Sequence, residues 1–323
     1  MYAQNLQIMN ILLSTDNNYV MPTGVLMTSI GINHIGKVHY YIIVDELFSE
    51  ASKKQLAATA KLYRADIDFC VIGDDFVKKI PFTNDEMSQG LTITTFYRLF
   101  LTEVLPENVH KIIYLDVDMI VRKSLQPLWD IDMTGYAIAG VPDMDEYEHV
   151  QSKRLPYPME TGYLNAGLLV INIDYWREQK MFPVFMYFIK ENKNILLAHD
   201  QDTLNCLFYN RKKVLSPYWN FQNGFLYHDK RYRNNLNSEI ENVKKDPAIV
   251  HYTGRKPWDI NCNNPQRFAW YNYLQLSLWK DFKVEKPRSF KMKIWYWLFR
   301  NNHWIRIFEI LPFNKHKRVV IRK

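Results

Sequence analysis

The stretch KIIYLDVDMIV, residues 111–121, contains seven apolar residues and a tyrosine, as a buried strand requires, yet two aspartates interrupt it. Asp116 and Asp118 are two positions apart, with apolar neighbours on both sides. In an extended strand, residues i and i+2 point to the same side, so the two carboxylates would face one point and repel each other unless a cation lies between them. Divalent ions such as Mn²⁺ and Mg²⁺ suit carboxylate ligands. The alternative is a strand end whose aspartates cap turns or pair with Arg and Lys.

Around this stretch, short apolar segments alternate with helical patterns, which predicts an α/β fold with a mostly parallel central sheet and helices on both faces. Ligands of such sheets bind outside the carboxyl ends of the strands. The segment STDNNY, residues 14–19, and the aspartate pair are therefore expected at one edge of the same sheet. The predicted strands are 8–14, 39–45, 66–72, 111–116, 136–142, 166–173 and part of 248–254, and the predicted helices are 19–33, 49–62, 94–105, 175–190 and 200–208.

A second candidate segment is AIVHYTGRKPW, residues 248–258, in which His251 follows another apolar strand. A lone histidine in that position is more often structural. Here, however, Gly254 permits close approach of the backbone, and Arg255 and Lys256 are cations suited to phosphate. The sequence has neither a Walker-type glycine loop nor a G-x-G-x-x-G motif, so a phosphate ligand would have to be held by a metal ion and side chains.

Charge is distributed unevenly along the 323-residue chain, whose net charge is +7. Residues 283–323 contain 12 Lys and Arg against two Glu, together with several Trp and Phe, whereas residues 1–282 are mildly acidic. We expect a globular domain over 1–282 and a basic, aromatic, helical tail over 283–323, with the boundary near Pro287. Such a tail is typical of a segment that lies on anionic lipid, and the alternative is a helix packed on the body with a solvated basic face. No recognised nucleic-acid module occurs, so no nucleic-acid partner is predicted.

The cellular location follows from what the sequence lacks. The first residues do not have the basic and apolar regions of a signal peptide, and no apolar run approaches the roughly 18 residues of a spanning helix. Cys70, Cys206 and Cys262 are scattered without zinc or redox spacing, which favours a reducing compartment. The expected location is cytoplasmic, peripheral on the inner face of the cytoplasmic membrane.

Several blocks of the sequence together form a recognisable pattern. The blocks are LLSTDNNYV (12–20), YRLFLTEVLP (97–106), KIIYLDVDMIV (111–121), LNAGLLVINIDYWR (164–177), HDQDTLNCLF (199–208) and HYTGRKPW (251–258). Their order and approximate spacing are those of glycosyltransferase family 8. Over roughly residues 8–280 the chain resembles this family and is similar to its bacterial lipopolysaccharide galactosyl- and glucosyltransferases.

The resemblance implies a GT-A (Rossmann-like nucleotide-diphospho-sugar transferase) fold for residues 1–282 and transfer of a hexose with retention of anomeric configuration. It implies UDP-galactose or UDP-glucose as the donor, Mn²⁺ as the cofactor with Mg²⁺ as the alternative, and a glycan or lipid-linked acceptor such as lipopolysaccharide or lipooligosaccharide. It also implies Asp116, Asp118 and His251 as the metal ligands. Two other functions stay open, a self-glucosylating, glycogenin-like protein and a catalytically silent UDP-sugar- or glycan-binding protein at the membrane. The three intact ligands argue against the silent protein.

The remaining site residues are carried over from the family pattern by position. Tyr19 would stack on the uracil ring and Asp16 would accept a hydrogen bond from it, although an Asx turn also explains Asp16. Gln201 stands where a nucleophile is often discussed, and an amide there favours same-face attack over a double displacement. The expected donor-binding residues are Ser14, Asp16, Asn18, Tyr19, Asp116, Val117, Asp143, Gly254 and Lys256, and the expected catalytic residues are Arg98, Asn165, Asp200 and Gln201.

Each catalytic candidate also has a structural interpretation. Arg98 lies on an otherwise apolar helical face and needs an anionic partner, which is either the donor or a structural carboxylate. Asn165 precedes Ala-Gly and could cap a turn. Asp200 and Gln201 could be ordinary first-turn residues of a helix, where acids are favoured.

Overall fold

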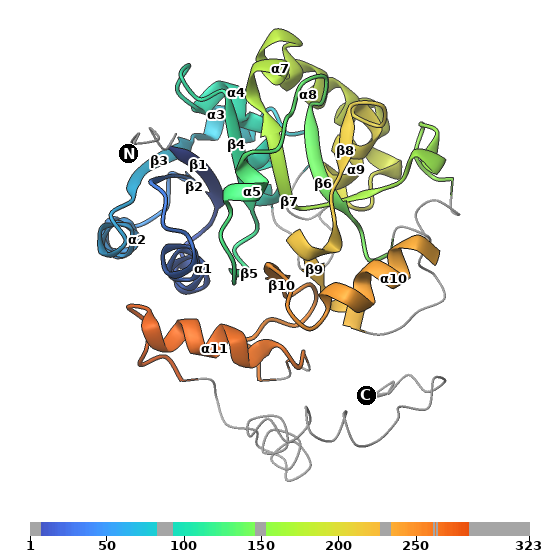
Figure 1. Cartoon of the computed structure of the whole chain (residues 1–323). Helices are drawn as coiled ribbons and strands as arrows, with labels where there is room; N and C mark the ends of the chain where they lie inside the picture. The colour runs from blue at the N-terminus through green and yellow to red at the C-terminus, as the bar shows by residue number, and fades with distance from the viewer. Residues whose placement is uncertain are drawn as a thin grey trace, which may run out of the picture.

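The computed structural model describes residues 8–82, 93–145, 153–226, 234–260, 262 and 264–283. Within these residues the chain forms a large sheet, covered by helices, and a small second sheet beside it (Figure 1). The predicted tail lies outside the described residues from residue 284 onward, so its helical and membrane-associating character stays a prediction. Among the helices of the described part, none combines the length and the hydropathy that crossing a membrane requires.

The inner strands of the large sheet are short and rich in β-branched and aromatic residues, as strands covered on both faces are. The strands of the sheet are β1 Met9–Ser14, β2 Val38–Asp45, β3 Asp66–Ile72, β4 Lys111–Leu115, β6 Ile138–Pro142, β7 Leu164–Asn172 and β8 Lys212–Val214. Their order is β3-β2-β1-β4-β7-β6-β8, and every strand except β7 runs in the same direction. The mostly parallel central sheet predicted from the sequence is confirmed.

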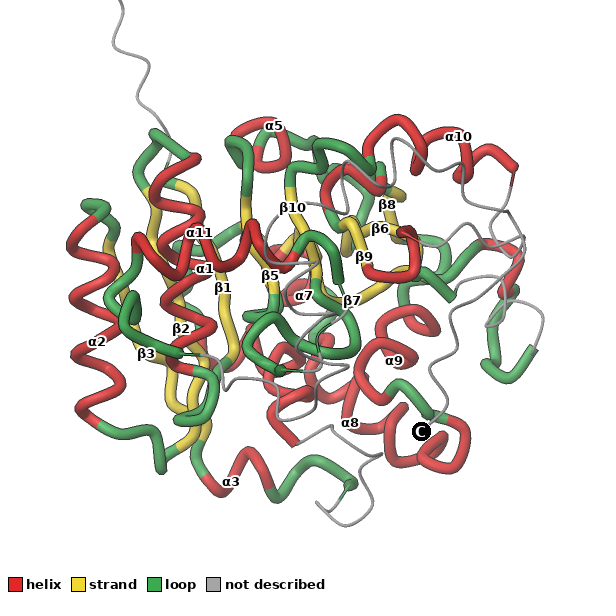
Figure 2. The backbone as a smooth tube through the Cα atoms, turned by 90° about the horizontal axis from the view of Figure 1, so that it is seen from below, coloured by secondary structure: helices red, strands yellow, loops and turns green. Residues whose placement is uncertain are grey.

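Helices cover both faces of this sheet because its strands are apolar on both sides. The main helices are α1 Val20–Asn33, α2 Glu50–Leu62, α7 Ile173–Glu178, α8 Met181–Asn192 and α9 His199–Leu207. In β1, Ile11 and Leu13 pack into a core with α1 and α2, whereas Leu12 packs into the opposite core with α7, α8 and α9. Figure 2 shows α2 and α9 far apart, with strands of the sheet between them.

A small sheet continues the chain beyond the carboxyl end of β4. It consists of β5 Met119–Val121, β10 Ile249–His251 and β9 Phe221–Gln222, in that order. Helix α11, Arg267–Leu276, packs against it and α1, since Val25, Val250 and Trp270 share one buried cluster. The remaining α-helices of the described residues are α3 Asp74–Val77, α4 Leu101–Val104, α5 Gln126–Trp129 and α10 Asn234–Val243.

Two predicted helices differ from the structure. Segment 94–105 is mostly a 3₁₀ helix, Ile93–Phe100, which is followed by the short α4. The residues from Phe96 to Leu101 are all buried, so tertiary packing and not an amphipathic pattern sets the winding. The helix predicted for 175–190 is divided into α7 and α8, because Lys180 between them has a φ of 49°, in the left-handed region.

Several predicted strands are shorter than expected, and two of these differences concern the site. Strand 111–116 ends at Leu115, and the aspartate pair lies in the turn that leads from β4 to β5. The strand within 248–254 is limited to β10, after which Gly254 adopts a φ of 85°. The chain therefore leaves one sheet and enters the other through the two aspartates.

Candidate functional site

One edge of the large sheet collects most of the predicted site residues. Strands β1, β4 and β6 end at this edge, and β7 begins there because it is antiparallel to β4 and β6. The backbone N–H of Asp116 donates to the carbonyl of Gly167 at 2.7 Å, which joins the end of β4 to the start of β7. Asn165, in β7, and Asp143, after β6, lie at the same edge. The reversal of β7 thus places its first residues beside the aspartate pair.

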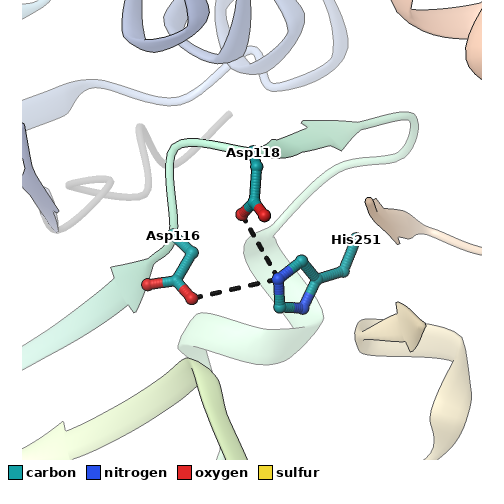
Figure 3. Close-up of side chains that lie close together, drawn as sticks. All are labelled: Asp116, Asp118 and His251. Atoms are coloured by element: carbon teal, nitrogen blue, oxygen red, sulfur yellow. Dashed lines mark ion pairs between the residues drawn. The ribbon is translucent and has the colours of Figure 1, made fainter. Parts of the chain in front are cut away.

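Asp116, Asp118 and His251 bring one ligand atom each to within 4.8 Å of one another (Figure 3). Nε2 of His251 lies 3.2 Å from Oδ1 of Asp118 and 3.9 Å from Oδ2 of Asp116. The three side chains meet as predicted, but the geometric reason given for the aspartates is wrong, since they occupy a turn and not an extended strand. β10 brings His251 to them by pairing with β5, with His251 opposite Met119.

The hydrogen bond of Nδ1, the second ring nitrogen of His251, determines which tautomer the neutral ring adopts. Nδ1 lies 3.0 Å from the amide oxygen Oδ1 of Asn220, an atom that can only accept. In the neutral ring the proton is therefore on Nδ1, and Nε2 turns a lone pair toward the two carboxylates. Two carboxylate oxygens and one imidazole lone pair that face one another form a donor set for a divalent cation, and Mn²⁺ or Mg²⁺ fits the oxygen-rich composition.

Each aspartate also has a basic partner. Lys256 donates from Nζ to Oδ2 of Asp118, and Arg98 donates to Oδ1 of Asp116 at 3.0 Å. Tyr114 donates its hydroxyl to the same oxygen of Asp116 at 2.6 Å. Burial alone would raise the pKa of Asp118, but the charge of Lys256, together with that of His251 when its ring is protonated, outweighs burial and holds that pKa well below its usual value. Asp118 is therefore ionised at neutral pH, as a metal ligand must be.

Arg98 is buried and lies beside two carboxylates, those of Asp116 and Asp200. Its Nε lies 2.9 Å from Oδ2 of Asp200, and its Nη1 donates to the carbonyl of Ala166 at 2.5 Å. Burial would lower the pKa of Arg98, but the charges of Asp200 and Asp116 outweigh burial and raise it. Burial also raises the pKa of Asp200 to about 7, because attraction by Arg98 only partly offsets it. Structural carboxylates thus supply the anion that Arg98 needs, and its contact with a donor stays a prediction.

Asn165, Asp143 and Gln201 bond to one another at the start of β7. Oε1 of Gln201 accepts from the backbone N–H of Ala166 at 2.8 Å, and its Nε2 donates to Oδ2 of Asp143 at 3.1 Å. Nδ2 of Asn165 donates to the same Asp143 oxygen at 2.9 Å. The half-buried Gln201 and the buried Asn165 therefore belong to one hydrogen-bonded group with Asp143, which goes beyond the local bonds of a first-turn residue or a turn cap.

The segment after β1 forms the Asx turn that the sequence offered as an alternative. Oδ1 of Asp16 accepts from the backbone N–H groups of Asn18 at 2.7 Å and Tyr19 at 3.1 Å, and α1 begins at the next residue. The ring of Tyr19 packs edge-on against Trp258 with centroids 6.0 Å apart, and the residue as a whole is 37% exposed. Contact of Asp16 and Tyr19 with uracil stays a prediction.

The other predicted donor residues lie near the same edge. Gly254 occupies the left-handed region, which a glycine adopts without strain, and two residues later Lys256 reaches Asp118. Val117 is buried between the two aspartates. Ser14 is the last residue of β1, and its hydroxyl is buried without a hydrogen-bond partner among the described residues.

Sequence reasoning missed Asn220 and the hydroxyl of Tyr114. Asn220 and Gln222 are fully buried amides that alternate with the aromatic residues Trp219 and Phe221. This alternation is the available signal, because a buried amide requires specific hydrogen-bond partners. It does not reveal which partners they are, since Asn220 and His251 are 31 positions apart.

Comparison with known proteins identifies the pattern. The model of glycosyl transferase family 8 matches residues 10–262. The chain is 28% identical to general stress protein A of Bacillus subtilis, over 84% of this chain and 95% of that protein. It is 27% identical to lipopolysaccharide 1,3-galactosyltransferase of Salmonella typhimurium, over 77% of this chain and 72% of that protein. The structure of galactosyltransferase LgtC in complex with donor and acceptor sugar analogs matches with a TM-score of 0.73 and 26% identity, over 88% of this chain and 100% of that one, which confirms the GT-A fold.

Proposed function

Because the chain belongs to glycosyltransferase family 8, we propose that it is a retaining, metal-dependent hexosyltransferase whose donor is UDP-galactose or UDP-glucose. Its family makes it a glycosyltransferase related to the lipopolysaccharide galactosyl- and glucosyltransferases. The observation that carries the proposal is the convergence of Asp116, Asp118 and His251 at a sheet edge where Lys256 and Arg98 add positive charge.

Asp116, Asp118 and His251 would hold a Mn²⁺ or Mg²⁺ ion, which supplies positive charge to a phosphate group. Lys256 adds a cation at the same place, beside Asp118. Negative charge develops on the leaving phosphate as the bond to the sugar breaks, and fixed cations lower the barrier most when they lie where that charge develops. Arg98 is held in place by its two carboxylate partners and does not have to reorganise during the reaction.

The residues near the expected sugar position favour same-face attack. Gln201 is an amide, a poor nucleophile, and both ends of it are engaged with Ala166 and Asp143. Asp200 is paired with Arg98. In same-face attack the bond from the anomeric carbon to UDP breaks, the acceptor oxygen bonds on the same side, and the leaving phosphate takes the acceptor proton. A covalent glycosyl adduct on Asp200, trapped in the wild type during turnover, would contradict this mechanism.

The test of the proposed function is release of UDP from a panel of UDP-sugars. We expect release from UDP-galactose or UDP-glucose with Mn²⁺ and none with a chelator. Asp118→Asn removes a ligand charge and should reduce release at least about 100-fold, since even groups one contact away from a metal contribute up to that much. Asp132→Asn is the matched control, because Asp132 is an exposed aspartate that bonds the backbone of Thr134. Full release in chelator would contradict metal dependence.

The acceptor is proposed to be a glycan or lipid-linked saccharide such as lipopolysaccharide, reached from the cytoplasmic face of the membrane through the basic tail. The lipopolysaccharide enzymes among the relatives support this acceptor class. Intact-mass measurement after incubation with UDP-glucose separates the alternatives: a mass increase of the chain itself indicates self-glucosylation. A donor that binds without UDP release indicates a silent binding protein.

A further inference from the structure

Asn220 is a fully buried amide that connects the metal-ligand group to the residues at the start of β7. It follows the 3₁₀ turn Pro217–Trp219 and precedes β9. Its Oδ1 lies 3.0 Å from Nδ1 of His251, and its Nδ2 donates to Oδ1 of Asn165 at 2.8 Å. Burying an amide is costly unless its polar groups are bonded, and both ends of this one are.

Backbone groups fix the direction of these bonds. The N–H of Gly167 can only donate, and it meets Asn165 at 3.0 Å, so the atom of Asn165 at that position is its oxygen. Asn165 then turns its Nδ2 to the carboxylate of Asp143. Because Asn165 presents an oxygen to Asn220, Asn220 must turn its Nδ2 to Asn165 and its oxygen to His251. The direction of the hydrogen bonds that link Asp143, Asn165 and Asn220 therefore requires that Nδ1 of His251 carries a proton.

We propose that Asn220 is a positioning residue of the metal site: it accepts the Nδ1 proton of His251 and so fixes the ring tautomer that presents the Nε2 lone pair to the ion. This inference rests on the proposed function, because it takes His251 as a ligand. Groups that bond the outer nitrogen of a metal-bound histidine contribute about 10- to 100-fold to metal affinity. Through Asn165, the same amide ties the orientation of the ligand to the residues near the expected sugar.

The competing explanation is that Asn220 only holds the loop before β9. That loop has other anchors. Ser216 accepts from the backbone N–H of Tyr218 at 3.2 Å, and Gln222 donates to the carbonyl of Pro142 at 2.9 Å. These anchors do not bond the imidazole of His251, so they hold the loop without determining the tautomer. A loop-holding role and a ligand-positioning role therefore predict different effects on metal binding.

Two substitutions in the full-length chain separate these roles. Asn220→Asp keeps an acceptor for Nδ1 of His251, whereas Asn220→Leu has a similar shape and no acceptor. Both variants lose the donor to Asn165, so the difference between them reports the acceptor for Nδ1. With Mn²⁺ alone as the probe, and free Mn²⁺ measured by electron paramagnetic resonance, we expect the Leu variant to bind about 10- to 100-fold more weakly than the wild type and the Asp variant to bind more tightly than the Leu variant. Wild-type affinity in a folded Leu variant, or equal losses in both variants, would overturn the proposal.

Asn172→Leu is the matched control. Asn172 is a partly buried amide at the far end of β7, where it caps α7 and bonds the carbonyls of Met133 and Tyr136. Its loss should lower the free energy of unfolding and leave the Mn²⁺ affinity unchanged. A loss of Mn²⁺ affinity in this control equal to that of the Asn220 variant would show that any lost amide weakens the site, which also overturns the proposal.

A measurement on the wild type decides the case if the Leu variant does not fold. Long-range ¹H–¹⁵N spectra of the metal-free chain, recorded at alkaline pH where imidazole is neutral and assigned with His251→Gln, report the tautomer directly. We expect the proton on Nδ1, and a proton on Nε2 would overturn the proposal. The spectrum needs neither metal nor turnover. Failure of the proposed function would appear separately, as a wild type that does not bind Mn²⁺ or release UDP.

Discussion

Arg98 shares its single positive charge between two buried or half-buried carboxylates. Asp116 contacts one side of the guanidinium and Asp200 the other, at 3.0 and 2.9 Å. With all three groups ionised, the cluster would carry a net negative charge in a place from which water is largely excluded, and such a charge is costly. A proton on one of the two carboxylates removes this net negative charge. Asp200 is the more deeply buried of the two, and burial raises the pKa of its carboxyl to about 7, so the proton is expected there.

This shift predicts a stability that depends on pH through Asp200. Between the unfolded-state pKa of an aspartate, about 4, and the folded-state pKa of about 7, the folded chain holds a proton that the unfolded chain has released. The free energy of unfolding therefore falls as the pH rises through this window. Relative to Asp200→Asn, which cannot titrate, the metal-free wild type should lose at least about 1 kcal/mol between about pH 4 and about pH 8, as measured by urea unfolding. Parallel pH profiles of the two proteins would contradict the raised pKa.

At this scale the sequence predicts charged residues better than neutral ones. The sequence indicates Asp116, Asp118 and His251 because carboxylates in an apolar stretch require an explanation and because the family blocks align all three. Asn220 carries no charge, and its role depends on two contacts that cross 31 and 55 positions of the chain. The same limit applies to Arg98. Its apolar neighbours in the sequence indicate that it needs an anionic partner, but only the fold shows that Asp116 and Asp200 are those partners.

The antiparallel strand β7 is the element that assembles the site, and Gly167 is its point of closest approach. A Cβ added at Gly167 would lie 2.4 Å from Cε1 of His251 and 2.9 Å from Oδ2 of Asp116. These distances leave no room for a methyl group, so β7 can pass beneath the two ligands only with glycine at this position.

Gly167→Ala should therefore displace the metal ligands. We expect Mn²⁺ affinity and Mn²⁺-dependent UDP release to fall at least about tenfold, with a loss of about 1–3 kcal/mol in the free energy of unfolding from overpacking. Gly140→Ala, on the neighbouring strand β6, is the control, because the three atoms nearest to its Cβ would belong to Leu169, Leu164 and Leu168, at 3.2, 3.3 and 3.3 Å, and none of these is a metal ligand. That variant should lose stability and keep its Mn²⁺ affinity. Wild-type Mn²⁺ binding by Gly167→Ala would show that the ligands can move aside without loss.

At the scale of elements, periodicity identifies the parallel strands and the amphipathic helix α2 and fails in buried segments. In the 3₁₀ helix Ile93–Phe100 every residue from Phe96 onward is buried, including Arg98, so the packing around it and not its own sequence pattern decides between 3₁₀ and α-helical winding. The direction of β7 is likewise absent from its own sequence, since a strand buried on both faces reads the same in either direction. Pairing with β4 and β6 decides it.

The whole molecule divides its charge between a mildly acidic body and a basic C-terminal segment. The body extends at least to the residues after α11, because Trp279 packs onto α1 at Gly24, where an added Cβ would lie 1.8 Å from the indole ring. Truncation after Lys283 therefore keeps this contact and the proposed metal site, and removes only residues outside the described part.

We expect the chain that ends at Lys283 to lose binding to anionic vesicles while UDP release from the donor stays within about twofold of the full-length chain, because the tail adds charge and the proposed site residues all lie between Ser14 and Lys256. Each Lys or Arg near an anionic surface contributes about 1 kcal/mol, so losing even a few of the tail's cations should weaken co-sedimentation more than about 100-fold. High salt should release the full-length chain from the same vesicles, because it screens this attraction. Neutral vesicles are the control. Equal vesicle binding by both chains would locate the membrane contact in the body, and a lower free energy of unfolding in the shorter chain would instead favour a tail packed on it.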